Sequence, residues 1–184
     1  MQQQKNIYFL SDFHLGAPNA QSSLEREKRI CRFLDRIKND ASVIFIVGDM
    51  FDFWFEYSTV VPKGYVRLLG KLAELTDSGI AIHFFVGNHD MWMKNYFQQE
   101  LNIPVYFEPK TFEFNCKKFF IAHGDGLGRR EADDDTAQKP RPCRCRHAVK
   151  IGQSDPRLIH GLRDQAVQLL DVDPRRDFRH HPAI

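Results

Sequence analysis

The chain has 184 residues, enough for one ordinary domain with its own hydrophobic core. Its 26 basic and 24 acidic side chains nearly cancel, so the charge gives no support for a nucleic-acid partner. Four irregularly spaced cysteines and an N-terminus without a signal-peptide pattern indicate a cytoplasmic protein rather than a secreted disulfide scaffold. No apolar run approaches the roughly 20 residues of a membrane-spanning helix, which leaves only peripheral membrane contact open.

Predicted strands and helices alternate along the first 128 residues. Short apolar runs predict strands at 7–10, 43–47, 80–86, 105–107, 111–114 and 118–122, the last two as a hairpin. Apolar residues at helical spacing predict helices at 22–39, 63–78 and 92–100. Ser22 and Glu25 fit a capping box, and Gly79 fits a C-cap. The pattern predicts an α/β layered domain whose first half is a largely parallel sheet.

The composition changes near Gly128. Fifteen of the 16 Phe lie before it, whereas 10 of the 15 Arg and five of the nine Pro lie in the last 56 residues. We therefore expect a domain at 1–128 and an Arg/Pro-rich, poorly ordered tail at 129–184, in which only 158–170 has a loosely helical pattern. The same change is typical of a linker, a second small domain or a shifted reading frame.

Polar clusters follow four of the predicted strands at the point where each strand ends. They are Asp12-Phe13-His14, Gly48-Asp49 with Asp52, Gly87-Asn88-His89-Asp90, and His123-Gly124-Asp125. Taken singly, each residue would be interpreted as a turn former or a hydrogen-bonded histidine. Together they fall on one edge of the sheet, where ligands gather, and their oxygen and imidazole donors suit divalent ions such as manganese, iron or zinc.

The spacing of these residues also suggests how two ions could be held. Two metals about 3.5–4 Å apart can clamp a phosphoryl group and activate water, and Asp49 is the candidate bridge. Side chains at alternate positions leaving a strand point to the same side, so we expect Asp12 and His14 to bind one ion. Asn88 and His123 then serve the other. The sequence predicts a metal-dependent phosphoester hydrolase.

The four motifs resemble those of the calcineurin-like metallophosphoesterases. Over about residues 6–128, the strings at 11–16 and 48–54 are most similar to the UDP-2,3-diacylglucosamine pyrophosphatases of lipid A synthesis. The resemblance implies a β-sandwich flanked by helices, here incomplete at its C-terminal end, with a dinuclear manganese centre. It implies hydrolysis of UDP-2,3-diacylglucosamine, a nucleotide-linked glycolipid, to UMP and 2,3-diacylglucosamine 1-phosphate at the inner face of the cytoplasmic membrane.

The resemblance also assigns residues. The metal ligands are Asp12, His14, Asp49, Asn88 and His123. His89 and Asp90 are the catalytic candidates, and Asn88, His89 and Trp54 are the candidate substrate contacts. The aromatic side chains at 51 and 53–55 favour a lipid substrate, although they equally fit a hydrophobic core.

One family motif is missing. The family completes its site with a downstream Gly-His-x-His that gives one imidazole to each ion, and neither Ile159-His160-Gly161 nor Arg179-His180-His181 has that form. Together with the loss of aromatic residues, this favours a truncated or frame-shifted gene product. Two alternatives remain: a metallophosphoesterase acting on another phosphoester, and an inactive family member.

Overall fold

The computed structural model describes residues 6–114, 117–124 and 170–171. A parallel sheet has the order β1-β2-β3-β4, and a smaller antiparallel sheet has the order β5-β6-β7. The strands are β1 (Asn6–Leu10), β2 (Ala41–Val47), β3 (Ala81–Phe85), β4 (Val105–Tyr106), β5 (Lys110–Phe114), β6 (Lys117–Ile121) and β7 (Leu170–Asp171). The helices are α1 (Ala20–Ile37), α2 (Val66–Asp77) and α3 (Tyr96–Leu101).

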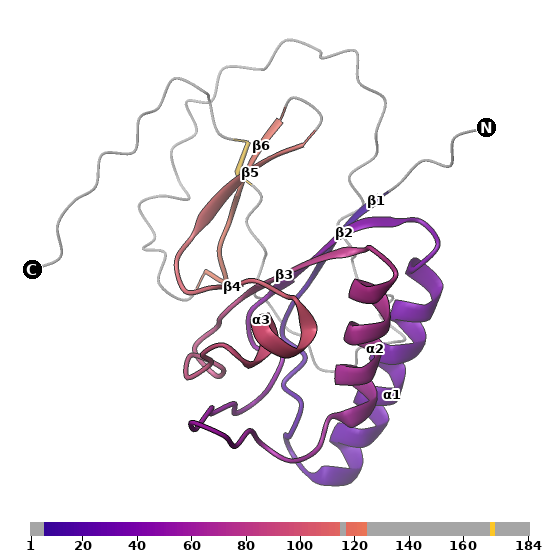
Figure 1. Cartoon of the computed structure of the whole chain (residues 1–184), viewed down its shortest axis with the longest axis vertical. Coiled ribbons are helices and arrows are strands. Elements are labelled where there is room, and N and C mark those ends of the chain that lie inside the picture. The colour runs from indigo at the N-terminus through magenta and orange to yellow at the C-terminus, as the bar shows by residue number, and fades with distance from the viewer. Residues whose placement is uncertain (1–5, 115–116, 125–169, 172–184) are drawn as a thin grey trace, which may run out of the picture.

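The parallel sheet is covered on both faces. Helices α1 and α2 lie side by side against one face, and the β5–β6 hairpin lies on the other (Figure 1). The predicted α/β layers, the parallel first half and the hairpin are therefore confirmed. The predicted tail at 129–184 lies outside the described residues, apart from Leu170 and Asp171 in β7.

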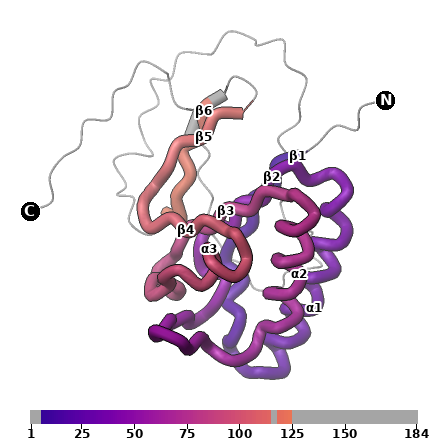
Figure 2. Tube along the Cα trace, in the orientation of Figure 1, coloured from indigo at the N-terminus to yellow at the C-terminus, as the bar shows by residue number. Residues whose placement is uncertain are grey.

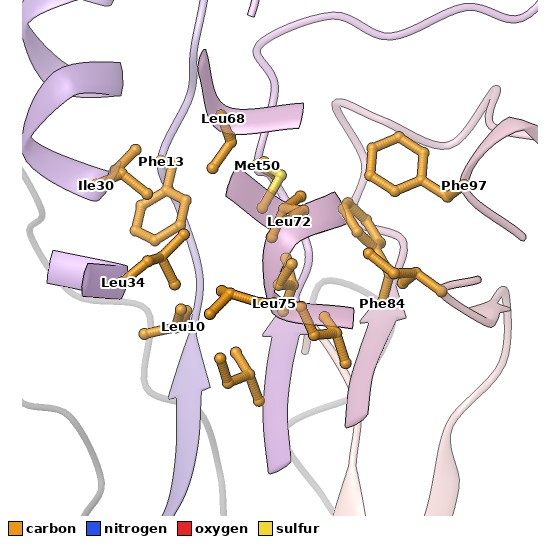
Figure 3. Packing of buried hydrophobic residues seen from close by; sticks show 14 of the residues in the cluster. Leu10, Phe13, Ile30, Leu34, Met50, Leu68, Leu72, Leu75, Phe84 and Phe97 are labelled. Atoms are coloured by element: carbon orange, nitrogen blue, oxygen red, sulfur yellow. The ribbon is translucent and has the colours of Figure 1, made fainter. Parts of the chain in front are cut away.

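Alternation along the strands creates two cores. Phe9, Phe45 and Phe85 point toward the second sheet, where they pack with β5 and β6. Ile44 and Ile46 point the other way, into the cluster with the apolar faces of α1 and α2 shown in Figure 3. Because successive strand side chains face opposite sides, a strand buried on both faces is apolar throughout, which explains the short unbroken runs in the sequence.

Each helix begins at a different residue from the one predicted. α1 starts at Ala20, because the Asn19 side chain accepts the backbone N–H of Ser22 at 2.9 Å and so caps the helix. The predicted capping box at Ser22 is therefore wrong. α2 starts only at Val66, after Tyr65 in a left-handed conformation, and α3 starts at Tyr96.

The loops that follow the first three strands all leave the parallel sheet at the same edge, where the carboxyl ends of the strands lie (Figure 2). Figure 2 follows these loops, which lead from β1 to α1, from β2 to α2 and from β3 to α3. In a parallel sheet the carboxyl ends of the strands lie on one edge, so the polar clusters at the three strand ends are brought together.

Candidate metal centre

The loops that leave β1 and β2 have an unusual backbone. Asp12, His14 and Asp49 all adopt positive φ, at 57°, 43° and 53°. Residues other than glycine rarely adopt this conformation, and such residues cluster at functional sites. The loops are joined, because the Asp12 N–H donates to the Gly48 carbonyl at 3.2 Å and the His14 N–H to the Asp49 carbonyl at 2.9 Å.

The Asp49 carboxylate lies at the centre of the cluster. Its Oδ2 is 3.7 Å from His14 Nε2 and 3.3 Å from His123 Nε2, and its Oδ1 accepts the backbone N–H of His89 at 3.1 Å. Two sets of metal-ligand atoms each lie within 4.8 Å of one another: Asp12 with Asp49 and His123, and His14 with Asp49 and His89. Asp49 belongs to both sets, as a bridging ligand does.

His123, which follows β6, presents one ring nitrogen to this cluster. Its Nδ1 pairs with the Val47 carbonyl at 2.9 Å, so Nδ1 carries the proton and donates. Its Nε2 is buried and makes no hydrogen bond, although Asp49 Oδ2 lies 3.3 Å away. A buried nitrogen without a hydrogen bond is costly, so Nε2 favours a bound cation. A histidine that binds a metal through one ring nitrogen typically donates the hydrogen of the other to a carbonyl, as Nδ1 does here. The donors present thus fit a divalent cation.

The charges of Asp49 and His123 are coupled. Burial opposes ionisation of Asp49, but His123 and the His89 backbone N–H stabilise the carboxylate and lower its pKa. Burial likewise opposes protonation of His123, but the Asp49 carboxylate and the Val47 carbonyl outweigh it and raise the pKa to about 9. In the protein without metal, His123 is therefore protonated, and a cation would have to displace the proton from Nε2.

His89 stands at the rim of the cluster. Its side chain is 39% exposed, and its Nδ1 pairs with the Asp52 backbone carbonyl at 3.0 Å. The ring packs edge-on against His14 at a centroid distance of 4.7 Å. The Asp52 carboxylate lies 3.6 Å from Nδ1 of each histidine, so one acidic group orients both rings.

Asp90 is fully buried behind these loops. Its oxygens accept the backbone N–H groups of Gly87 at 2.6 Å and Met50 at 3.0 Å, which ties the loop after β3 to the loop after β2. Burial raises the pKa of its carboxyl group to about 6. In this structure Asp90 supports the loops that carry Asp49 and His89; a direct catalytic role stays a prediction.

The two remaining candidates lie in different surroundings. Asn88 is exposed between Gly87 and His89, at the same edge as the cluster. Trp54 is fully buried, packs against Phe51 and Phe97, and donates its Nε1 hydrogen to Glu56 at 3.0 Å. The predicted substrate contact through Trp54 is wrong for this structure, since its ring belongs to the core.

The pairing of Asp12 with His14 on one ion stays a prediction. Asp12 and His14 fall in different sets, although Asp12 Oδ1 and His14 Nε2 are 3.9 Å apart. The prediction assumed an extended chain in which alternate side chains share a side, and the left-handed conformation of both residues removes that alternation. Sequence reasoning also missed the second ligand set through His89. Asp125 of the fourth motif lies outside the described residues.

Comparison with known proteins finds a family and several relatives that match this chain. The model of the family described as calcineurin-like phosphoesterase matches residues 5–163, a range that continues past Gly128. A UDP-2,3-diacylglucosamine hydrolase from Porphyromonas gingivalis is 49% identical over 119 residues, covering 65% of this chain and 45% of that protein.

Two further relatives carry the same name. The one from Nitrosococcus oceani is 27% identical, covering 95% of this chain and 66% of that protein. The one from Proteus mirabilis is 30% identical, covering 72% and 52%. The chain thus spans between about half and two thirds of the length of these curated relatives.

Proposed function

The chain belongs to the calcineurin-like phosphoesterase family, and on that premise we propose that it hydrolyses the pyrophosphate bond of UDP-2,3-diacylglucosamine. The products are UMP and 2,3-diacylglucosamine 1-phosphate, and the cofactor is a pair of divalent ions, Mn²⁺ in the first instance. The relatives named UDP-2,3-diacylglucosamine hydrolase support the choice of substrate.

One observation carries the proposal: the Asp49 carboxylate is shared by two sets of ligand atoms, and the buried Nε2 of His123 faces it without a hydrogen-bond partner. Asp12 and His123 would hold one ion with Asp49, and His14 and His89 would flank the other. Asn88 is exposed at the same edge and is the proposed further ligand. When bound, two such ions supply Lewis-acid charge that neutralises phosphate oxygens and favours ionisation of water.

The protein's own groups account for substrate orientation and proton movement. With Nδ1 held by the Asp52 carbonyl, His89 presents its Nε2 away from that contact, where it can donate a hydrogen bond to a phosphate oxygen or a proton to the departing group. The Asp52 carboxylate lies 3.6 Å from the same Nδ1 and helps to orient the ring. The left-handed loops hold these groups before substrate arrives, so little reorganisation is needed.

Exposed apolar side chains on the segments that follow Asp52 and Asp90 support a lipid-linked substrate. They are Phe53, Phe55, Tyr57, Val60, Met91 and Trp92. The rings of Phe53 and Trp92 are in contact, with a centroid distance of 5.5 Å. Trp92 lies in the segment that directly follows His89 and Asp90. Contiguous exposed apolar surface marks sites for lipids or other apolar ligands.

The proposed location is the cytoplasm, with peripheral contact at the inner face of the cytoplasmic membrane, where acyl chains reside. Among the described residues, no helix is both long and apolar enough to cross a bilayer. The near balance of charge over the whole chain supports a substrate other than nucleic acid.

Turnover of two substrates tests this function. The purified chain is supplied with Mn²⁺ and either UDP-2,3-diacylglucosamine or p-nitrophenyl phosphate, with Asp49→Asn as the blank and the exposed Asp77→Asn as the matched control. We expect UMP release that D49N abolishes and D77N retains. Turnover of p-nitrophenyl phosphate alone would instead assign a phosphoesterase of another specificity, and turnover of neither would contradict an active enzyme.

A further inference from the structure

The side chain of Arg26, on α1, reaches the loop that carries Asp12 and His14. Its Nη1 donates to the backbone carbonyls of Phe13 at 3.1 Å, His14 at 2.7 Å and Ala17 at 3.0 Å. One guanidinium nitrogen has two hydrogens, so at least one of them is shared between two carbonyls. Three carbonyls of a single loop therefore converge on one positively charged nitrogen.

The loop needs such support because its backbone is irregular. Asp12 and His14 have positive φ, and Gly16 follows at 115°. Two further side chains hold its second half, where Ser23 Oγ accepts the Gly16 N–H at 2.8 Å and the Tyr65 hydroxyl donates to the Leu15 carbonyl at 3.1 Å. The Leu15 carbonyl also accepts the Asp52 N–H at 2.9 Å. Of these three side chains, Arg26 is the one that contacts the carbonyl of a candidate ligand, His14.

We propose that Arg26 is a positioning residue for the metal centre, which holds the 12–17 loop so that Asp12 and His14 face Asp49. The inference rests on the proposed function for its metal, but the loop conformation that it explains is a property of the protein alone. Charge-assisted hydrogen bonds are stronger than those between neutral groups. Mutation of a group that orients a metal ligand typically weakens metal affinity by about 10–100-fold.

A second effect of the same side chain acts in the opposite direction. A guanidinium near a cation site repels the cation, so removal of the charge alone would raise the affinity for Mn²⁺. A positioning role predicts the opposite result, a weaker affinity for Mn²⁺. The variant Arg26→Gln removes the charge and with it the three charge-assisted hydrogen bonds, so the sign of its effect on Mn²⁺ affinity decides between the two effects.

The test compares Arg26→Gln with Arg29→Gln, an exposed arginine on the same helix, and with Arg26→Lys, which keeps the charge. In the metal-free chain, hydrogen exchange is followed at the amides of Asp12, His14 and Leu15, which donate to residues 48–50. We expect exchange at these amides to quicken at least ~10-fold in R26Q and to stay unchanged in R29Q. Calorimetry should show Mn²⁺ affinity ~10–100-fold weaker in R26Q, partly restored in R26K.

Three outcomes would overturn the inference: unchanged exchange at the loop amides, tighter Mn²⁺ binding by R26Q, or exchange that rises equally at the core amides of Leu72 and Leu75. The last would reveal a general loss of stability. If the unaltered chain binds no Mn²⁺, the proposed function fails, and the exchange rates in the metal-free protein decide the role of Arg26 by themselves.

Discussion

Each end of the parallel sheet carries a partly buried polar cluster built around one aspartate. At the amino ends of β1 and β2, the Asp40 carboxylate accepts hydrogen bonds from Asn6 Nδ2 at 2.6 Å and the Tyr8 hydroxyl at 2.9 Å. At the carboxyl ends, Asp49 is surrounded by another carboxylate and by imidazoles, one of which has a nitrogen without a partner. The first cluster is complete as it stands, whereas the second has acceptors in excess of donors and so favours a cation.

The largest expected effect comes from removing the central carboxylate of the second cluster. Asp49→Asn removes a ligand from both sets, so we expect Mn²⁺-dependent turnover to fall at least ~10³-fold and bound metal to fall below one ion per chain. Asp40→Asn is the matched change at the opposite end of the sheet and should leave both quantities unchanged. Equal losses in the two variants would remove the contrast between the clusters.

Replacing the rim histidine should separate chemistry from metal binding. His89→Gln keeps a polar side chain but cannot transfer a proton, so kcat should fall ~10²–10⁴-fold. If His89 acts mainly as the proton donor, the metal content measured by mass spectrometry stays near that of the unaltered chain. A parallel loss of metal would make His89 a ligand of the second set instead.

A glycine beside His123 should be almost as sensitive as the ligands. A Cβ on Gly48 would overlap the His123 ring, and Gly48 also has a φ of 76°. We expect Gly48→Ala to weaken Mn²⁺ binding ~10–100-fold, as loss of ligand orientation does. Gly64→Ala is the control, because Gly64 has a φ of 112° with open space around it and so isolates the backbone cost. Similar metal affinity in both variants would contradict this account.

The coupled pair predicts a dependence on pH. The folded pKa of His123 is about 9, above its ordinary value of 6.5, so in the metal-free chain its stabilisation is complete below about 6.5 and is lost as the pH rises through about 9. A metal must displace the same proton, so Mn²⁺ affinity should rise about tenfold per pH unit between pH 7 and 8. Titrations at several pH values check this, and His123→Gln should abolish the slope.

The smallest effect is expected at the amino ends of the strands. Asp40→Asn turns one acceptor oxygen into a donor and leaves Asn6 or Tyr8 poorly paired, so the free energy of unfolding should fall by about 1–2 kcal/mol. Urea denaturation measures it. No change in the midpoint would show that the Asp40 cluster is not needed for stability.

The sequence predicted much of this contrast. Short apolar runs identified most of the strands, and the residues that follow them identified the edge where Asp12, Asp49 and His123 meet. This worked because a strand buried on both faces and ending in a ligand-bearing turn leaves a local pattern. The hairpin of β5 and β6 was predicted from two short strand-like runs joined by a turn.

Other features depend on conformation or on contacts between distant residues, which leave no local pattern. The left-handed φ of Asp12 and His14 sets the direction of their side chains, and the alternation of an extended strand does not apply to them. For Trp54, which stands between Phe53 and Phe55, the sequence left both a substrate contact and a core position open; its burial follows from packing against α3. The contacts of Arg26 cross from a helix to a loop nine or more residues away.

The central claim is that the strand-end cluster around Asp49 holds two divalent ions. It is tested most directly by the metal content of the purified chain after equilibration with Mn²⁺ and removal of the excess. We expect roughly two ions per chain and less than one in Asp49→Asn. Fewer than one ion in the unaltered, folded chain would contradict it.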